Sequence, residues 1–134
     1  MRTAPVYGAF FSDMKTTANV TPIFVSGPDS LPSVSSLNEA FESASSPVKA
    51  ILITNPGNPT GQVIPRDILL SWIRWANEKG IHCIVDEVYM LSVWGDAVFE
   101  SVLGLEEVDL QKTHVIWSFS KDFGMSGMRS GVIM

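Results

Sequence analysis

The sequence predicts an α/β fold with a mainly parallel, doubly wound sheet. Three runs of residues, at 49–54, 81–85 and 114–117, have the length of strands and are apolar almost throughout rather than at alternate positions. Strands that are covered on both faces of a parallel sheet have this pattern. Segments with helical spacing alternate with these runs, as the crossovers between parallel strands require.

The N-terminal third is expected to supply one further strand and one helix. Residues 19–26 predict a first strand, which Pro22 interrupts. A loop rich in serine and proline follows at residues 30–36 and leads to a helix near residues 37–45. Ser36 and Glu39 have the spacing of a capping box at the start of this helix.

The middle of the chain predicts a longer helix from Pro65 to about Lys79. Proline is favoured in the first turn of a helix, and Gly80 is a typical stop. The apolar positions recur at helical spacing: Ile68, Leu69, Trp72, Ile73 and Ala76. We therefore assign Trp72 and Trp75 to core packing rather than to ligand contact.

The C-terminal third has a less regular pattern. A short helix is expected at residues 99–103, and residues 130–134 predict a last strand. The loop that precedes this strand is too short for a helical crossover. We therefore expect the last strand to be antiparallel to its neighbour.

Composition narrows the class of protein. With 134 residues, 46% of them hydrophobic, the chain can form the core of one domain. Its net charge of −5 argues against nucleic acid or an anionic membrane as a partner, and no apolar run could span a bilayer. The single cysteine, Cys83, lies in a predicted strand and favours a cytoplasmic location. His82 and His114 begin separate strands, so we assign both to structure and predict no metal site.

Polar residues follow two of the predicted strands. Residues 55–61 read Asn-Pro-Gly-Asn-Pro-Thr-Gly, a tight turn because each proline restricts itself and its predecessor. This turn can present Asn58, while Asp86 and Tyr89 follow the run at 81–85. Open α/β sheets bind ligands at this edge. There a carboxylate can pair with a protonated pyridine nitrogen, and an amide and a phenol can donate to a phenolate oxygen.

The most informative segment surrounds Lys121, which comes shortly after the apolar run at 114–117. Ser118 and Ser120 precede the lysine, and Arg129 follows in a glycine-rich turn. A lysine in a partly apolar site can be a neutral nucleophile, and serine and arginine suit a phosphate. These are the requirements of a pyridoxal 5'-phosphate (PLP) site. The alternative is a surface lysine and arginine on a loop.

The residues quoted above, together with others in register, resemble the fold-type I PLP enzymes of the class I and II aminotransferase family. The resemblance is closest to the animal branch similar to 1-aminocyclopropane-1-carboxylate (ACC) synthase. It runs from near residue 4 to the end of the chain. Four strings carry it: residues 4–8 (Ala-Pro-Val-Tyr-Gly), 55–61, 86–93 (Asp-Glu-Val-Tyr-Met-Leu-Ser-Val) and 114–124 (His-Val-Ile-Trp-Ser-Phe-Ser-Lys-Asp-Phe-Gly).

The resemblance implies a role for each matching residue. Lys121 would be the Schiff-base lysine and would later move the α-proton of the substrate. Asp86 would hold the pyridinium nitrogen protonated, and Tyr89 and Asn58 would hydrogen-bond the phenolic oxygen. The remaining residues would contact the phosphate or the ring: Ser118, Arg129 and, more weakly, Ser120 for the phosphate, and Tyr7 for stacking on the ring. Simple packing is the alternative for Tyr7, and Glu87 and Asp122 are interpreted as solvated or structural.

The resemblance also implies what residues 1–134 represent. They correspond to the central part of the PLP-binding large domain, without the N-terminal arm and the C-terminal small domain. The parent would be a homodimer acting on an amino acid, by transamination or α,γ-elimination, whereas the isolated chain would be inactive. Thr60 departs from the plant ACC synthase pattern and argues against ACC synthesis itself. The alternative is a truncated or catalytically idle PLP-binding fragment with a binding or interaction role.

Overall fold

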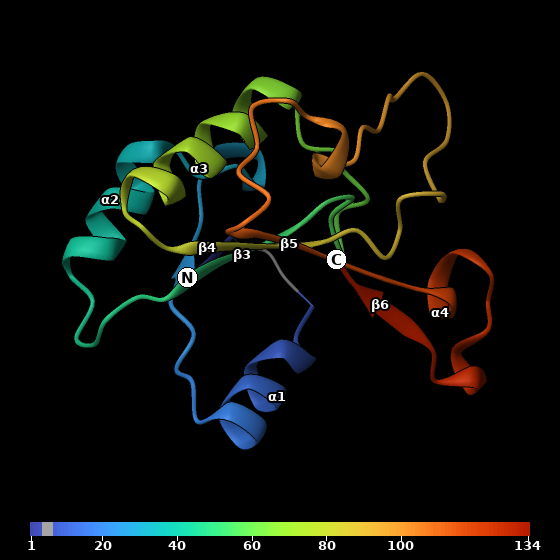
Figure 1. Ribbon diagram of the computed structural model, residues 1–134, viewed down its shortest axis with the longest axis horizontal. Coiled ribbons are helices and arrows are strands. Elements are labelled where there is room, and N and C mark those ends of the chain that lie inside the picture. The colour runs from blue at the N-terminus through green and yellow to red at the C-terminus, as the bar shows by residue number, and fades with distance from the viewer. Residues whose placement is uncertain (4–6) are drawn as a thin grey trace.

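The computed structural model describes residues 1–3 and 7–134 and contains one mixed sheet with helices on both sides (Figure 1). The strands are β1 (Arg2–Thr3), β2 (Phe24–Val25), β3 (Ala50–Thr54), β4 (His82–Asp86), β5 (Thr113–Ser118) and β6 (Gly131–Ile133). The α-helices are α1 (Ala9–Ala18), α2 (Val34–Glu42), α3 (Arg66–Glu78) and α4 (Phe119–Asp122). The 3-10 turns are η1 (Pro28–Ser30), η2 (Val102–Gly104) and η3 (Ser126–Met128).

The strand order is β2-β1-β3-β4-β5-β6, and all neighbouring pairs are parallel except β5 and β6. The predicted α/β class with a mainly parallel sheet is confirmed, as is the antiparallel last strand. Because β3, β4 and β5 run in the same direction, their carboxyl ends meet at one edge of the sheet. The polar residues that follow these three strands are therefore brought together.

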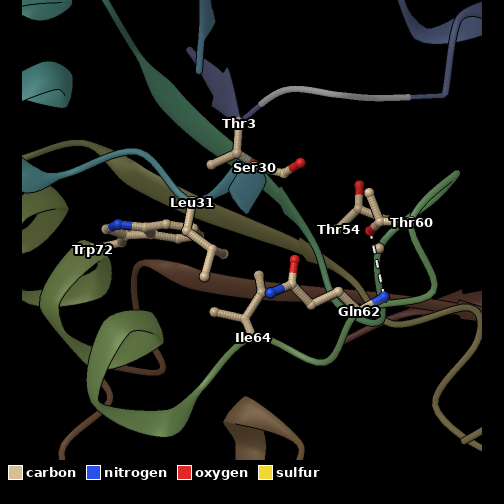
Figure 2. Close-up of a pocket in the computed structure, with 9 residues that line it drawn as sticks. Thr3, Ser30, Leu31, Thr54, Thr60, Gln62, Ile64 and Trp72 are labelled. Atoms are coloured by element: carbon tan, nitrogen blue, oxygen red, sulfur yellow. Dashed lines mark hydrogen bonds between the residues drawn. The ribbon is translucent and has the colours of Figure 1, made fainter. Parts of the chain in front are cut away.

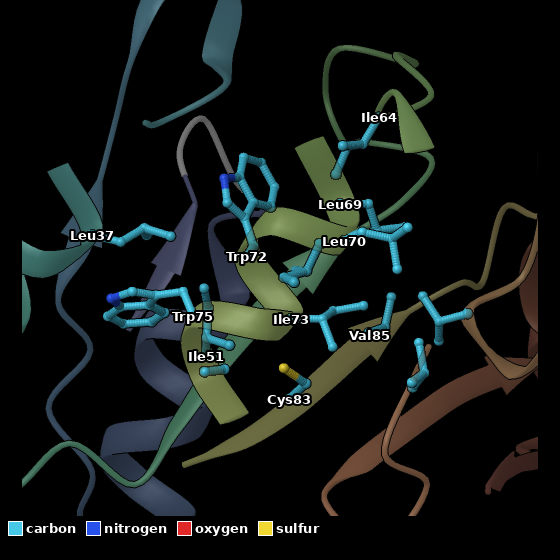
Figure 3. Packing of buried hydrophobic residues seen from close by; sticks show 14 of the residues in the cluster. Leu37, Ile51, Ile64, Leu69, Leu70, Trp72, Ile73, Trp75, Cys83 and Val85 are labelled. Atoms are coloured by element: carbon cyan, nitrogen blue, oxygen red, sulfur yellow. The ribbon is translucent and has the colours of Figure 1, made fainter. Parts of the chain in front are cut away.

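The main core lies between one face of the sheet and the helices α2 and α3. Five odd-numbered residues of the central strands lie in it and are completely buried: Ile51, Ile53, Cys83, Val85 and Val115. Helix α3 covers them with residues of its own, and Figure 3 shows Trp75 beside Ile51 and Ile73 beside Val85. The core assignment of Trp72 and Trp75 is confirmed, since they are 1% and 3% exposed.

The opposite side of the sheet is covered less completely. Helix α1 lies on that side, across the sheet from α2 and α3 (Figure 1). The even-numbered residues Ile84, His114 and Ile116 are only half-buried there, and Phe24 is exposed. The expected cover on both faces is therefore present, but the two layers differ in extent.

Two predicted elements near the N-terminus are wrong in their limits. The strand expected at residues 19–26 is reduced to β2, because Asn19 is the left-handed C-cap of α1, a helix that the sequence did not predict. Helix α2 begins at Val34, not near residue 37. Its N-cap is Ser33, whose Oγ accepts from the amide of Ser36 at 3.1 Å. Ser36 thus lies inside the helix, and the expected capping box is wrong.

The remaining elements agree with expectation more closely. Helix α3 follows Pro65 and ends before Lys79 and Gly80, whose φ of +70° suits glycine. In place of the short helix expected at residues 99–103 there is the shorter 3-10 turn η2, which begins at Val102, three residues later, and is capped by Ser101. Within the described residues, no helix is long and apolar enough to cross a membrane.

Candidate functional site

The carboxyl ends of β3, β4 and β5 are joined by backbone hydrogen bonds. The amide of Asn55 donates to the carbonyl of Asp86 at 3.0 Å, and the amide of Glu87 donates to the carbonyl of Ile116 at 2.9 Å. Because these bonds extend the ladders one residue past the strands, the first residues of the following loops are fixed relative to one another. The loops after β3 and β4 contain Asn58 and Tyr89, and Lys121 lies in α4, which directly follows β5.

The turn after β3 is held by its own backbone and by one buried side chain. Gly57 donates to the carbonyl of Gln62 at 2.9 Å, and Asn55 Oδ1 accepts from the amide of Ile64 at 2.9 Å. Both Asn–Pro peptide bonds in the turn are cis. A Cβ on Gly57 would collide with the Thr60 hydroxyl, so the close packing of the turn requires glycine. Asn55 is therefore a structural residue, which leaves Asn58 as the amide presented at the edge.

Three of the predicted site residues lie close together. Asn58 Nδ2 donates to the hydroxyl of Tyr89 at 3.4 Å, and Lys121 Nζ lies 5.9 Å from the centre of the Tyr89 ring. An open cavity of about 210 Å³ adjoins them, lined by the residue 56–61 turn, Tyr89 and Ser92. An amide and a phenol from two separate loops therefore line one space, and an exposed amine on α4 lies near the phenol ring.

A second cavity lies nearby, between the residue 57–62 turn, η1 and α3. Figure 2 shows Leu31, Ile64 and Trp72 on one side of it and Thr3, Thr54 and Thr60 on the other. Its volume is only about 20 Å³, enough for a water molecule but not for an organic ligand. The larger cavity beside Tyr89 is therefore the candidate binding site.

Asp86 ends β4 at the same edge and is only 8% exposed. Its Oδ1 accepts from the amide of Val88 at 3.2 Å, which fixes the carboxylate at the start of the turn that contains Tyr89. A buried carboxylate at the carboxyl end of a parallel strand is well placed to hold a cationic group of a ligand.

The residues predicted to bind the phosphate have backbones that lie near one another, but their side chains form hydrogen bonds with different partners. Ser118 caps α4, and its Oγ accepts from the amide of Ser120 at 3.3 Å. Arg129 has a left-handed φ of 49°, is exposed, and donates from Nη1 to the carbonyl of Ser126 at 2.7 Å. Gly131 pairs with Ser118 in the β5–β6 ladder, so Arg129 lies two residues before the first paired residue of β6. The backbones near Ser118 and Arg129 are therefore close together, whereas the Arg129 guanidinium is hydrogen-bonded within its own turn.

Tyr7 lies at the start of α1. Its ring packs edge-on against Phe10, with 5.5 Å between the ring centres, and the residue is 47% exposed. The expected motif at residues 4–8 falls partly outside the described residues, since residues 4–6 are not described. The contact with Phe10 agrees with the packing interpretation and leaves one face of Tyr7 accessible.

Two acidic residues prove to be structural, although the sequence gave them no assigned role. Glu87 is completely buried, so the solvated interpretation is wrong for it; its Oε1 accepts from the amide of Val102 at 2.9 Å. Burial raises the pKa of the Glu87 carboxyl, while Ser101 and Val102 oppose the rise. Asp122 is half-buried and accepts hydrogen bonds from β5 and from the turn that contains Tyr89. Their position directly after Asp86 and Lys121 was the only signal in the sequence.

The two residues assigned to structure at the start of β4 and β5 are in contact. His82 Nδ1 and His114 Nε2 share a hydrogen bond of 2.9 Å, although the sequence separates them by 32 residues. Among the described residues, no group of three or more potential metal ligands occurs. Burial raises the pKa of the Cys83 thiol to about 12, which agrees with its prediction as a core residue.

Comparison with known proteins places this geometry in a family. The family of class I and II aminotransferases matches residues 5–134. ACC synthase 6 of Arabidopsis thaliana is 34% identical over 96% of the chain, and human ACC synthase-like protein 1 is 39% identical over 96%. The structure of aspartate aminotransferase from Thermotoga maritima superposes with a TM-score of 0.84 over 99% of the chain, at 30% identity.

The chain spans about 28% of the length of these two relatives and 35% of the Thermotoga chain. Enzymes of the class I and II aminotransferase and ACC synthase type depend on PLP. The matched region contains the edge of the sheet at which Asn58, Asp86, Tyr89 and Lys121 lie. The chain belongs to the class I and II aminotransferase family.

Proposed function

We propose that this chain is the central part of the large domain of a PLP-dependent enzyme of amino-acid metabolism, similar to aminotransferases and ACC synthase, in which Lys121 is the Schiff-base lysine. The observation that carries the proposal is the convergence of three residues at the carboxyl edge of the sheet: Asn58 and Tyr89 line one cavity, and the amine of Lys121, on α4, lies 5.9 Å from the Tyr89 ring.

The residues at this edge fit the chemistry of PLP. The cofactor has an aldehyde, a phenolic oxygen, a pyridine nitrogen and a phosphate, and the edge offers an amine, two hydrogen-bond donors, a buried carboxylate and a capping serine. When bound, PLP stabilises negative charge that develops at the α-carbon of an amino acid. No part of the cofactor requires a residue type that this edge lacks.

Each residue then has a definite task. The carboxylate of Asp86 keeps the pyridine nitrogen protonated, and the hydroxyl of Tyr89 donates to the phenolic oxygen together with Asn58 Nδ2. The amine of Lys121 would hold the cofactor through its aldehyde group and would also be the base that moves the proton of the substrate's α-carbon. The remaining contacts are to the phosphate, from Ser118, Ser120 and Arg129, and to the ring face, from Tyr7.

The substrate class is an α-amino acid, converted by transamination or by α,γ-elimination. The presence of Thr60 in place of the residue usual in plant ACC synthases favours transamination. The relatives are more than three times longer than the chain. We therefore assign turnover to a cytoplasmic homodimer of the full-length parent protein rather than to these residues alone.

The second candidate is a truncated or catalytically idle fragment with a binding role. The observation that favours it is the state of the phosphate residues, because Arg129 is bonded to its own turn and not to Ser118. In such a protein Lys121 would be an ordinary exposed lysine. The experiment below separates the two candidates.

The test compares Lys121 with Lys112, which flank the same strand at its opposite ends. PLP is added to the full-length parent protein, borohydride is added to reduce the C=N bond between lysine and aldehyde, and peptides are mapped by mass spectrometry. We expect the pyridoxyl group on Lys121, its loss in Lys121→Ala, and no change in Lys112→Ala. Equal labelling of both lysines, or labelling that persists elsewhere in Lys121→Ala, would refute the proposal and favour the idle fragment.

A further inference from the structure

The carboxylate of Asp122 joins three segments of the edge. Its Oδ2 accepts from the indole nitrogen of Trp117 at 3.0 Å and from the amide of Leu91 at 3.2 Å, and its Oδ1 accepts from the hydroxyl of Ser92 at 2.6 Å. Trp117 belongs to β5, Asp122 to the helix that contains Lys121, and Leu91 and Ser92 to the turn that contains Tyr89. Bonds from three donors to one carboxylate define its position closely.

These bonds connect the helix that contains Lys121 with the turn that contains Tyr89. Lys121 precedes Asp122 within the single turn of α4, so anchoring Asp122 also fixes the Cα of Lys121. On the other side, the amide of Ser92 donates to the carbonyl of Tyr89 at 2.9 Å, so the bond from Ser92 to Asp122 reaches Tyr89 through one backbone link. The bonds of Asp122 and Ser92 thus link the backbones of Lys121 and Tyr89, and Lys121 Nζ lies 5.9 Å from the centre of the Tyr89 ring.

Aromatic rings surround the connection on the side of β5. The ring of Trp117 contacts Phe119 at 4.9 Å and Phe123 at 6.1 Å between ring centres, and both contacts are steeply inclined. Such edge-to-face arrangements are favourable and hold the indole ring in place. A hydrogen bond to an ionised carboxylate is stronger than one between neutral groups, so the contact between Trp117 and Asp122 can hold α4 against the strand.

We propose that Asp122 is a positioning residue for the active site, which sets the Lys121 amine relative to Tyr89 by clamping α4 to β5 and to the residue 89–92 turn. This inference rests on the proposed function, because it assumes that Lys121 binds the cofactor. Asp122 acts through Lys121 and Tyr89 and need not touch substrate or cofactor. Its contribution is geometric, and its negative charge matters only as an acceptor for the three donors.

Two variants of the same residue separate geometry from charge. Asp122→Ala removes all three bonds. Asp122→Asn can keep them, since its oxygen can accept from Trp117 and Leu91 while its nitrogen donates to Ser92 Oγ. Trp117→Phe removes one donor and keeps a ring in place. Asp96→Ala, which changes an exposed aspartate in the loop that follows the same turn, is the matched control for loss of a negative charge.

The readout is the fraction of Lys121 that becomes pyridoxylated at a limiting concentration of PLP, with the pyridoxylation of Lys112 measured in the same digests. We expect Asp122→Ala to lower the labelling of Lys121 by about tenfold or more, because misplacement of a reacting group by ~1 Å can cost about 100-fold in rate. Labelling of Lys112 should not change. Asp122→Asn should restore most of the labelling, Trp117→Phe should cause a smaller loss, and Asp96→Ala should cause none.

The indole N–H proton resonance of Trp117 gives a second readout that does not involve PLP. It should move upfield in Asp122→Ala and remain near its original position in Asp122→Asn. Thermal melting followed by circular dichroism shows whether each variant is folded; if Asp122→Ala is not, Trp117→Phe decides. Equal labelling of Lys121 in the wild type and in the folded variants would overturn the inference. So would an Asp122→Asn variant as impaired as Asp122→Ala. Absence of labelling at Lys121 in the wild type would refute the proposed function instead.

Discussion

The amino and carboxyl ends of the parallel strands form two opposite edges of the sheet, here called the amino edge and the carboxyl edge. These two edges contain similar residue types in different surroundings. At the amino edge, Lys49 and Lys112 precede β3 and β5, and His82 and His114 bond to each other at 2.9 Å with their rings stacked 5.1 Å apart. At the carboxyl edge, the amide of Asn58 and the phenol of Tyr89 line a cavity and share only a long hydrogen bond of 3.4 Å, and the amine of Lys121 lies 5.9 Å from the Tyr89 ring.

The difference lies in how the residues are held. At the amino edge the histidines are themselves strand residues, so they project from the face of the sheet and satisfy one another. At the carboxyl edge the polar residues lie on loops whose backbones are fixed by hydrogen bonds, such as those of Gly57 and Asn55. Fixed loops can hold side chains around an open space, which is the arrangement that ligand binding requires.

Among substitutions at the two edges, the largest expected effect is the loss of kcat on replacing Asp86. In the full-length parent, Asp86→Asn should lower kcat by about 100- to 1000-fold, the range found when one charge-stabilising contact in an active site is removed. The neutral amide cannot keep the pyridine nitrogen protonated. The matched change at the amino edge, Asp109→Asn in the loop before β5, should leave kcat unchanged. Steady-state assays of both variants provide the measurement, and an unchanged kcat in Asp86→Asn would show that this carboxylate is only structural.

A smaller effect is expected for the pair formed by Tyr89 and Asn58. Tyr89→Phe should weaken PLP binding by about 1 kcal/mol, or about fivefold, the net contribution of one hydrogen bond. Because the two side chains are bonded at 3.4 Å, Asn58→Ala should add little in a Tyr89→Phe background. Titration followed by the absorbance of PLP measures each affinity, with His82→Gln as the control at the amino edge. Fully additive losses would indicate that the two residues bind the cofactor independently.

The smallest expected effect on cofactor binding is that of Glu87, which lies at the carboxyl edge but faces the core. Its pKa is raised by burial, so the folded chain holds the proton more tightly than the unfolded chain. The stability from Glu87 is therefore complete below the ordinary value of 4.5 and is lost as the pH rises through the raised pKa. Glu87→Gln should flatten this dependence and leave PLP affinity unchanged.

Urea unfolding of the wild type and Glu87→Gln across this pH range measures the effect. The stability of the wild type relative to the variant should fall as the pH rises. The unpaired Glu87 Oε2 makes the ionised form costly in the buried site. A relative stability that rises with pH would reverse the sign and would imply a favourable partner for the carboxylate.

Much of the fold was accessible from the sequence. The strands β3, β4, β5 and β6 and the helix α3 were predicted nearly to the residue, because their apolar patterns and flanking turns are local signals. The same signals assigned Asn58, Asp86, Tyr89 and Lys121 to the ends of parallel strands. Chain direction and register then bring those ends to one edge, so the neighbourhood of the site followed from topology alone. The roles of these residues remain predictions.

Tertiary structure decided the features that depend on contacts between distant segments. Helix α1 was missed because none of its residues is buried, so it lacks a strong apolar stripe. The contact between His82 and His114 and the bonds of Asp122 to Leu91 and Ser92 join residues about 30 apart in sequence. No local pattern encodes such pairs, because they form only when packing of the strands sets the distance between their loops. The polar residue types were determined by the sequence, and their partners by the fold.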